Sequence, residues 1–481
     1  MDAQRGIARR MVIGLPPEGL SPAWERDFAA YPPAGVVVFA RDFRDLSDLR
    51  RLTARLRQLA RPRRLFLAAD EEGGFVSQLG AHLVVPPNAL LFGRGAAAGD
   101  IEWACRVTGE RLRALGLDWV FAPVADIHSQ PLNPVIGPRA YGTDAASVAA
   151  RAGEALRGFR AARVASCLKH FPGHGDSLLD SHLALPAITA SRETLDAREL
   201  LPFRVHRGAD AVMTAHVVVS ALDPGRPATF SRPIVHDLLR DDLGFHGVCI
   251  TDALEMKGAS EGREASESAR LALAAGCDLL MFATHDEAVR RARLELARAL
   301  VDGKLDRAAF DAARPRLARL DGALPEPAEE ETSRPLEALT PADWEPRLAA
   351  ICERGLRFAG ALPAAATAGA WSVSEPETVR HPSLGEALAG QGVPIATETE
   401  STIHVEAIAT RKALDEARLA ELANQCRARP TVLVALQNDA FLTKVPQAAL
   451  TVSACDGTAL TLGAVARRLS ALRLETSRER A

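Results

Sequence analysis

The chain has 481 residues, of which 47% are hydrophobic and 25% charged, and its formal net charge is -3. This is the composition of a globular protein with enough apolar residues for two domains, since a barrel domain alone takes roughly 250 residues. The balanced charge, without a basic arm or an acidic tail, excludes nucleic acid and membrane surfaces as partners attracted by bulk charge.

The cysteines and the first residues indicate the compartment. Seven cysteines are scattered along the chain without close pairs, so they predict neither a disulfide framework nor a zinc ribbon. Residues 1–20 carry arginines but no apolar stretch long enough for a signal peptide. No apolar run is long enough to cross a bilayer. We therefore expect a cytoplasmic protein with reduced thiols.

Short apolar runs followed by segments of helical period dominate the first two thirds of the chain. The predicted strands are residues 35–40, 65–70, 119–126, 166–171, 211–216, 247–252 and 277–282. Strands that alternate with helices form a parallel sheet, and seven or eight such units favour a closed barrel. Polar residues end most of these runs, namely Asp70, Asp126, His170, His216 and Asp252. We therefore predict a TIM-type (β/α)8-like barrel over residues 1–320, with its active site at the carboxyl ends of the strands.

The composition changes after the predicted barrel. Residues 321–344 are rich in proline, glutamate and alanine, which is typical of a linker between domains. Further apolar runs follow at residues 370–374, 401–409, 430–436 and 449–455. They alternate with helical patterns, and so predict a smaller α/β sandwich domain over residues 345–481.

The densest group of ionisable residues lies in "KHFPGHGDSLLDSH", residues 169–182. Its proline and glycines predict a loop that leaves the strand at 166–171. Three interpretations are open. His170 and His174 are spaced as metal ligands on a helix, but the intervening Pro-Gly pair breaks a helix. The histidines could only hydrogen-bond the loop. Asp180 and His182 could form an acid/base pair, in which the carboxylate fixes the imidazole tautomer.

Asp252 is the second candidate of interest. It ends the apolar run 247–252 and should point into the mouth of the barrel. A carboxylate in that position must be solvated, paired or functional, because burial without a partner is costly. An alternative is that Asp252 only caps the following helix. The residues alone leave both interpretations open.

Three motifs together resemble glycoside hydrolase family 3, in its β-N-acetylglucosaminidase branch. They are the loop at 169–182, "VMTAHVVV" at 212–219 and "ITDALEM" at 250–256. In the same order as in the family lie "DEEGG" at 70–74, "FAPVADI" at 121–127 and "VIGPRAYG" at 135–142. The resemblance covers roughly residues 10–320 and is weaker in the second domain.

The resemblance implies a retaining, exo-acting β-N-acetylglucosaminidase that needs no metal or cofactor and takes a small carbohydrate. It places the nucleophile at Asp252, the acid/base at His182 and its carboxylate partner at Asp180. It implies further contacts with the terminal sugar from Asp70, Arg139, Lys169, His170, Thr214 and His216. In the β-glucosidase branch the acid/base is a glutamate from elsewhere, so the Asp-Ser-His loop favours N-acetylglucosamine over glucose.

Some features depart from the family pattern or leave its use open. Phe75 and Gln78 stand where the family usually has arginines, and Pro138 replaces a residue that is often acidic. The second domain could complete the sugar pocket, mediate dimerisation or support the barrel, and the sequence leaves the oligomeric state open. The five tryptophans and two tyrosines in all offer no aromatic platform for a long polysaccharide, so a short substrate is expected. The resemblance implies that this substrate is a short cell-wall (muropeptide-type) fragment from peptidoglycan recycling.

Three rival functions are retained. A histidine acid/base is not anionic when deprotonated, so phosphate could replace water and make the protein a β-N-acetylglucosaminide phosphorylase. A metal-dependent barrel hydrolase would use His170, His174 and Asp252. A sugar-binding protein without activity is the third alternative.

Overall fold

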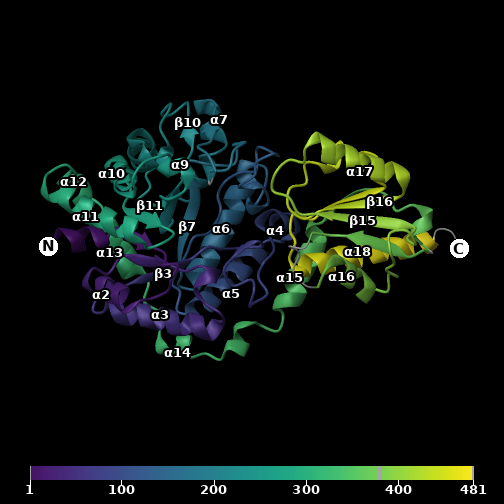
Figure 1. Cartoon of the computed structure of the whole chain (residues 1–481), viewed down its shortest axis with the longest axis horizontal. Coiled ribbons are helices and arrows are strands. Elements are labelled where there is room, and N and C mark those ends of the chain that lie inside the picture. The colour runs from purple at the N-terminus through teal and green to yellow at the C-terminus, as the bar shows by residue number, and fades with distance from the viewer. Residues whose placement is uncertain (1, 182, 368, 377–381, 479–481) are drawn as a thin grey trace.

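The computed structural model describes residues 2–181, 183–367, 369–376 and 382–478. A large barrel and a smaller sheet domain lie beside each other along its longest axis (Figure 1). Within the described residues, eight parallel strands close the barrel in the order β1-β12-β11-β9-β7-β6-β3-β2. These strands are β1 (Met11–Ile13), β2 (Gly35–Val37), β3 (Phe66–Ala69), β6 (Trp119–Val120), β7 (Ala165–Phe171), β9 (Ala211–Thr214), β11 (Val248–Ala253) and β12 (Leu279–Phe282). The predicted barrel followed by an α/β sandwich is confirmed.

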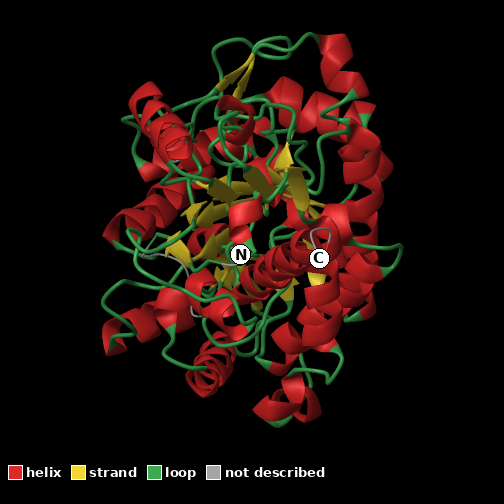
Figure 2. Cartoon of the chain, turned by 90° about the vertical axis from the view of Figure 1, so that its right-hand side faces the viewer, coloured by secondary structure: helices red, strands yellow, loops and turns green. Residues whose placement is uncertain are grey.

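Helices surround the barrel strands (Figure 2). They are α1 (Ala3–Ala8), α2 (Pro22–Ala30), α3 (Leu46–Ala60), α4 (Ala89–Gly95), α5 (Asp100–Ala114), α6 (Ala145–Ala161), α7 (Arg192–Ala197), α8 (Leu201–Val205), the π-type helix η4 (Pro233–Asp242), α9 (Lys257–Ser260), α10 (Ala265–Ala275), α11 (Glu287–Val301), α12 (Arg307–Asp311) and α13 (Arg314–Ala323). Helix α3 shows why they form. Asp45 caps its first turn by accepting a hydrogen bond from the Asp48 amide, and Leu49 and Leu56 lie on its buried face.

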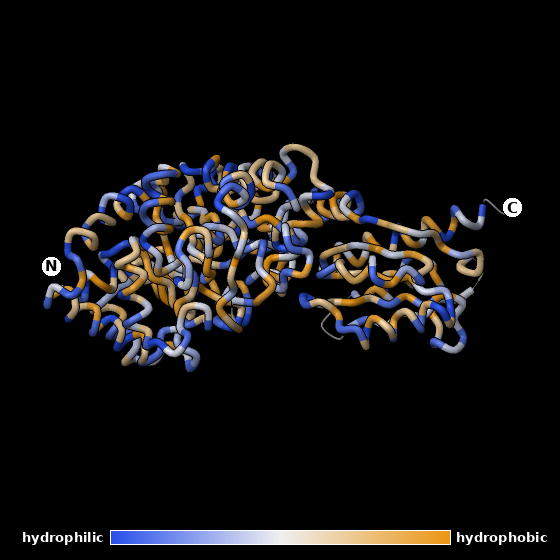
Figure 3. The backbone as a smooth tube through the Cα atoms, turned by 90° about the horizontal axis from the view of Figure 1, so that it is seen from above, coloured by the Kyte–Doolittle hydropathy of each residue, from blue (hydrophilic) through white to orange (hydrophobic). Residues whose placement is uncertain are grey.

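Apolar side chains fill the barrel from inside and outside. Trp119, Phe121 and Met281 belong to the cluster within the strands, while the helices bury a larger cluster against the outer face. In Figure 3 the hydrophobic segments accordingly gather in the middle of each domain and the hydrophilic ones lie at the periphery. The barrel is therefore a packed core, which leaves its strand ends to build a site.

Short elements extend the loops at the strand ends. They are β4 (Glu71–Gly73), β5 (Val76–Ser77), β8 (Ala187–Ile188), β10 (Val218–Val219) and the 3₁₀ helices η1 (Ala40–Asp42), η2 (Gly137–Arg139) and η3 (Ala228–Phe230). Strands β4 and β5 form a hairpin, and β8 pairs with β10. The hairpin and η2 both contribute to the site described below.

The second domain is a sheet covered on both faces (Figure 1). Its described strands follow the order β13-β17-β16-β15-β14, and the edge strand β13 is antiparallel. The strands are β13 (Arg357–Gly360), β14 (Trp371–Ser374), β15 (Ile403–Ile408), β16 (Thr431–Ala435) and β17 (Leu450–Ser453). The helices are α15 (Trp344–Gly355), α16 (Leu384–Gly390), α17 (Glu416–Ala428) and α18 (Ala459–Arg478), with short 3₁₀ turns η6 (Ala364–Ala366) and η7 (Leu442–Lys444). Helix α17 covers one face, and α16 and α18 cover the other.

The segment predicted as a linker is partly helical and lies on the barrel. It contains the end of α13, α14 (Glu329–Thr332) and η5 (Leu336–Leu339). Glu331 forms an ion pair of 2.6 Å with Arg113, and the Leu339 carbonyl accepts a hydrogen bond from Arg111. Within the described residues, no helix is both long and apolar enough to cross a membrane.

Candidate active site

A cavity of about 250 Å³ lies at the carboxyl ends of the barrel strands. Predicted site residues line it from several strands and loops, namely Asp70, Arg139, Lys169, His170, Asp180 and Asp252. The volume is below the roughly 300–1,000 Å³ of sites for drug-sized ligands, and fits a single sugar unit better than a long polymer. His182 lies outside the described residues.

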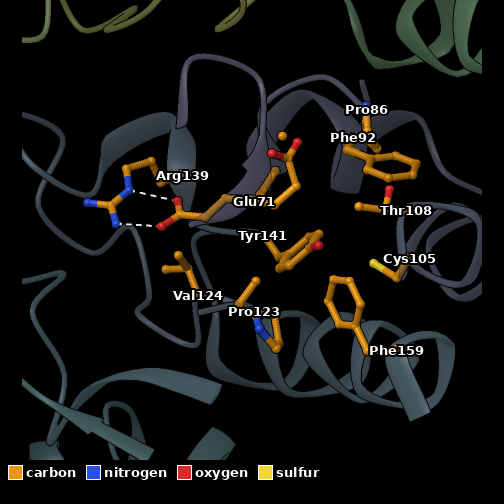
Figure 4. Close-up of a pocket in the computed structure, with 14 residues that line it drawn as sticks. Glu71, Pro86, Phe92, Cys105, Thr108, Pro123, Val124, Arg139, Tyr141 and Phe159 are labelled. Atoms are coloured by element: carbon orange, nitrogen blue, oxygen red, sulfur yellow. Dashed lines mark hydrogen bonds and ion pairs between the residues drawn. The ribbon is translucent and has the colours of Figure 1, made fainter. Parts of the chain in front are cut away.

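Glu72 joins two cations of the cavity, Arg139 and Lys169. It accepts hydrogen bonds of 2.8 Å from Nε and Nη2 of Arg139. Figure 4, a close-up of an adjoining pocket that shares Glu72 and Arg139 with this cavity, draws these bonds as dashed lines from the labelled Arg139. Oε1 of Glu72 also lies 2.6 Å from Nζ of Lys169. Burial disfavours the charged form of Glu72, but the charges of Arg139 and Lys169 outweigh burial and lower its pKa well below the usual value.

The β4–β5 hairpin determines which glutamate reaches the cavity. Successive side chains of a strand point to opposite faces, so Glu71 and Glu72 diverge. Glu71 turns inward and accepts hydrogen bonds from Ser77 and the Gln78 and Leu79 amides, and burial raises its pKa to about 7. The sequence motif contains both glutamates, but its local pattern does not say which one faces the site.

The glycines of the "DEEGG" motif allow the tight turn of this hairpin. Gly73 and Gly74 have φ values of +95° and +55°, which favour glycine. A Cβ atom on Gly74 would also lie 1.8 Å from Oδ1 of Asn88. The turn therefore requires glycine, and it fixes Glu72 between its two cations.

Lys169 is held between two carboxylates. Its Nζ lies 2.6 Å from Oδ1 of Asp70 as well as from Glu72. Burial alone would lower the pKa of Lys169, but the charges of Asp70 and Glu72 raise it above the usual value. The ammonium group is therefore a fixed cation with hydrogen atoms to donate to a hydroxylated ligand.

Asp126 fixes the start of the histidine loop. It is fully buried and accepts hydrogen bonds from Nδ1 of His170 at 2.6 Å and from the His174 amide at 2.7 Å. Burial opposes its ionisation, but the charge and hydrogen bond of His170 lower its pKa. Nε2 of His170 faces Arg139 at 3.5 Å, so Asp126 orients the ring at the cavity wall.

His174 lines the cavity, and both of its ring nitrogens are engaged within the loop. Its ring nitrogens lie 3.0 Å from the hydroxyl of Ser177 and 2.9 Å from that of Ser181. Burial lowers the pKa of His174 to about 4, so the ring is neutral at pH 7. These contacts match the interpretation of His174 as a loop-stabilising residue and do not match a metal-ligand pair with His170.

Asn133 connects the loop that carries Arg139 to the loop that carries Asp180. Its Oδ1 accepts from the Val135 and Ile136 amides, and its Nδ2 donates to the carbonyl groups of His174 and Gly175 at 2.9 and 3.1 Å. An asparagine before a proline reads as an ordinary turn residue, so the sequence did not single it out.

Asp252 lies near the end of β11 with its side chain in the cavity wall. Its Oδ1 accepts a hydrogen bond of 2.7 Å from the amide of Ala253, the next residue. The first helix after it, α9, begins at Lys257 and has Met256 as its N-cap. Asp252 is therefore not the N-cap of that helix, which removes the structural alternative considered from the sequence.

Thr214 and His216 lie behind the wall, and neither is among the described residues that line the cavity. Both side chains are buried and contact the hydroxyl of Thr229 at 2.9 and 2.8 Å. Nε2 of His216 also lies 3.0 Å from the carbonyl oxygen of Ala253. Their direct contact with the sugar stays a prediction, and the contact of His216 with Ala253 links the segment after β9 to the end of β11.

Two of the three departures from the family pattern lie at or next to the cavity: Gln78 lines it and Phe75 packs under a residue that lines it. Gln78 donates to the Asp70 carbonyl at 3.2 Å and accepts from the Ala40 amide at 2.8 Å. The ring of Phe75 lies 4.3 Å below the guanidinium carbon of Arg411, a residue of the second domain that also lines the cavity. The sequence did not predict Arg411, because nothing local signals that this loop docks on the barrel.

Comparison with known proteins assigns the family. The model described as the glycosyl hydrolase family 3 N-terminal domain matches residues 24–320, more than half of the chain. The chain belongs to glycosyl hydrolase family 3. It is therefore an enzyme, a glycoside hydrolase, and the resemblance found in its motifs is confirmed.

Relatives in family 3 are similar in both sequence and structure. The chain is 37% identical to a β-hexosaminidase of Alkalilimnicola ehrlichii over 291 residues, which cover 58% of this chain and 82% of that protein. It superimposes on a β-N-acetylglucosaminidase of family 3 from Paenibacillus sp. str. FPU-7 with a TM-score of 0.87 and 28% identity, covering 98% and 96% of the two chains. A β-glucoside phosphorylase aligns with a TM-score of 0.82 at 18% identity, covering 98% of this chain and 91% of the other, which shows the shared fold alone.

Proposed function

We propose that this glycoside hydrolase removes terminal β-linked N-acetylglucosamine with retention of configuration. The observation that carries the proposal is that Asp252 and Asp180 line one small cavity with the Asp70–Lys169–Glu72–Arg139 network. The names of the β-hexosaminidase and β-N-acetylglucosaminidase relatives agree with this substrate.

The proposed mechanism has two steps. Asp252 attacks the anomeric carbon, while His182 protonates the departing oxygen and the sugar becomes bound to Asp252 as an ester. His182, now neutral, then takes a proton from water, which attacks the same carbon and releases Asp252. Asp180 is the proposed carboxylate partner of His182 and favours the imidazolium form. An ordinary imidazole has a pKa of about 6.5, so it can serve in both steps near neutral pH.

The cations and His170 are proposed to bind the hydroxyl groups of the terminal sugar. Lys169 and Arg139 are each held by Glu72, so their donors keep fixed directions. Donors that are fixed before the substrate arrives need no reorganisation during the reaction. The cavity volume supports the removal of one sugar from a chain end, and short cell-wall (muropeptide-type) fragments are the proposed substrates.

The experiment that tests this function is aryl-group release from an aryl β-N-acetylglucosaminide and from the matching aryl β-glucoside. Each is assayed with and without phosphate, and the sugar product is identified. Free N-acetylglucosamine from the first substrate alone supports the proposal. Sugar 1-phosphate would identify a phosphorylase, and activity on the glucoside alone would overturn the assigned sugar. Inactivity on both would favour a sugar-binding protein.

A further inference from the structure

The second domain places a cation in the catalytic cavity. Arg411 follows β15 and, among the described residues that line the cavity, is the one that comes from the second domain. It shares the wall with Asp252 and Asp180. A glycosidic bond that is cleaved between these carboxylates would therefore lie close to the part of the cavity wall that Arg411 forms.

The loop that carries Arg411 is attached to the barrel. The carbonyl oxygen of Thr410 accepts a hydrogen bond of 2.9 Å from the Asn438 amide. The side chain of Asn438 in turn donates to the carbonyl oxygen of Pro131 at 3.0 Å, in the barrel loop that leads to Arg139. The position of Arg411 over the cavity thus depends on contacts on both sides of the domain interface.

Phe75 supports the guanidinium group from below. The guanidinium carbon lies 4.3 Å from the centre of the ring, which is the geometry of a cation–π contact. Phe75 is itself fixed, because its amide donates to Oδ1 of Asn88 at 3.1 Å. Asn88 also donates to the Cys455 carbonyl and to the Asp456 side chain of the second domain. The stack is therefore built into the interface.

Arg411 differs from the other cations of the cavity in its pairing. Lys169 and Arg139 are neutralised by carboxylates at 2.6 to 2.8 Å. None of the ion pairs found among the described residues involves Arg411. Its side chain is exposed, and the charged groups that act on it are Arg139, Asp180 and Glu72. The guanidinium group therefore lies in the cavity wall with exposed surface and, in the part of the chain that the structure describes, with donors that no ion pair occupies.

We propose that Arg411 is a specificity-determining residue that binds a carboxylate on the leaving group, next to the bond that is cleaved. The inference rests on the function proposed above and adds a requirement for negative charge on that side of the substrate. Arginine suits this role because its planar group donates two parallel hydrogen bonds to a carboxylate. The contact with Phe75 keeps that plane oriented before the substrate binds.

The test compares three substrates of the full-length enzyme. The first is a disaccharide in which N-acetylglucosamine is β-linked to a sugar that bears an ether-linked carboxylate. The second is the same disaccharide with that carboxylate converted to an amide. The third is an uncharged aryl N-acetylglucosaminide. Arg411→Ala should lower kcat/KM for the carboxylate about 10- to 100-fold, which is the range for lost charge-assisted hydrogen bonds. The amide and the aryl substrate should lose no more than about threefold, and the carboxylate preference of the unmodified enzyme should weaken as salt is added.

Two further variants separate recognition from a structural effect. Arg411→Lys retains the charge without the planar pair of donors, so it should recover part of the preference. Lys412→Ala removes the neighbouring cation of the same loop, which lines a different depression, and should leave all three rates unchanged.

The outcomes distinguish this inference from the function on which it rests. Equal losses on carboxylate and amide in Arg411→Ala would overturn it, as would an unmodified enzyme that does not prefer the carboxylate. If Arg411→Ala lost only the phosphate-dependent formation of sugar 1-phosphate, Arg411 would bind the phosphate acceptor instead. That result would also overturn the proposed carboxylate contact. Failure of the unmodified enzyme on the aryl N-acetylglucosaminide would overturn the proposed function itself.

Discussion

Glu72→Gln is the perturbation that most directly tests the charge network of the cavity. The side chains involved are almost fully buried, with exposed fractions of 6% for Glu72, 11% for Arg139 and 2% for Lys169. Lys169 retains Asp70. Arg139 loses its carboxylate, and among the described residues its remaining partners are the Val135 carbonyl at 3.2 Å and the His170 ring. Removing one partner of a buried pair costs about 3–5 kcal/mol. Because glutamine keeps one acceptor oxygen, we expect the lower end, about 3 kcal/mol, at pH 7.

The sign of the pH dependence follows from the lowered pKa of Glu72. A carboxyl group whose pKa is lower in the folded state stabilises the protein above its unfolded pKa, here about 4.5. That stabilisation is lost as the pH falls towards the folded value. The difference in unfolding free energy between the unmodified enzyme and Glu72→Gln should therefore shrink below about pH 4.5.

Urea titrations measure the free energy of unfolding, and kcat/KM on an aryl N-acetylglucosaminide measures the effect on catalysis at the cavity. We expect kcat/KM to fall at least 10-fold, because Arg139 is no longer fixed at the cavity. Glu110→Gln is the control, since it removes a carboxylate from an exposed pair with Arg106 and should change stability by no more than about 0.5 kcal/mol. A Glu72→Gln variant with the stability and kcat/KM of the unmodified enzyme would refute the reasoning.

Three other predictions concern the loops around the cavity. His182→Ala should slow substrates with poor leaving groups far more than aryl substrates with good ones, and equal losses in kcat/KM would argue against an acid role. Asn133→Asp places a carboxylate against the His174 and Gly175 carbonyl groups, so urea titrations should show a loss of about 1–3 kcal/mol together with reduced kcat; unchanged values would show that it does not couple the loops. Burial raises the pKa of Glu199 to about 7 despite its pair with Arg198, and in the described part of the chain its Oε2 has no hydrogen-bond partner. The folded protein therefore holds this proton more tightly than the unfolded chain, and stability falls as the pH rises from about 4.5 to about 7. Glu199→Gln should remove up to about 3 kcal/mol of that fall, and an identical pH profile would contradict it.

The barrel could be predicted because its strands are buried on both faces and read as continuous apolar runs. Strands β1 and β13 were not predicted from the sequence, because their hydrophobic patterns are weaker. Strand β1 has three residues directly after Arg9 and Arg10, and β13 is a mostly exposed edge strand. Neither gives an apolar run that stands out from its flanking residues.

The site could be predicted as far as its residues follow strand ends. Asp70, His170 and Asp252 lie where parallel strands bring their carboxyl ends together. Their positions at the ends of predicted strands were therefore sufficient to assign them to one site. Glu72 and Arg411 depend instead on a hairpin and on docking of a second domain. Such contacts between distant segments leave no periodic trace in the sequence.

The central claim is that Asp252 becomes covalently bound to the sugar. The direct measurement is mass spectrometry of the enzyme after incubation with an activated N-acetylglucosaminyl donor that carries a fluorine on its ring, because the fluorine slows hydrolysis of the glycosyl-enzyme. We predict a mass increase of one fluorinated sugar unit, located by peptide mapping on Asp252 and absent in Asp252→Asn. A sugar attached to a different residue, or aryl release from the donor without any adduct, would contradict the account.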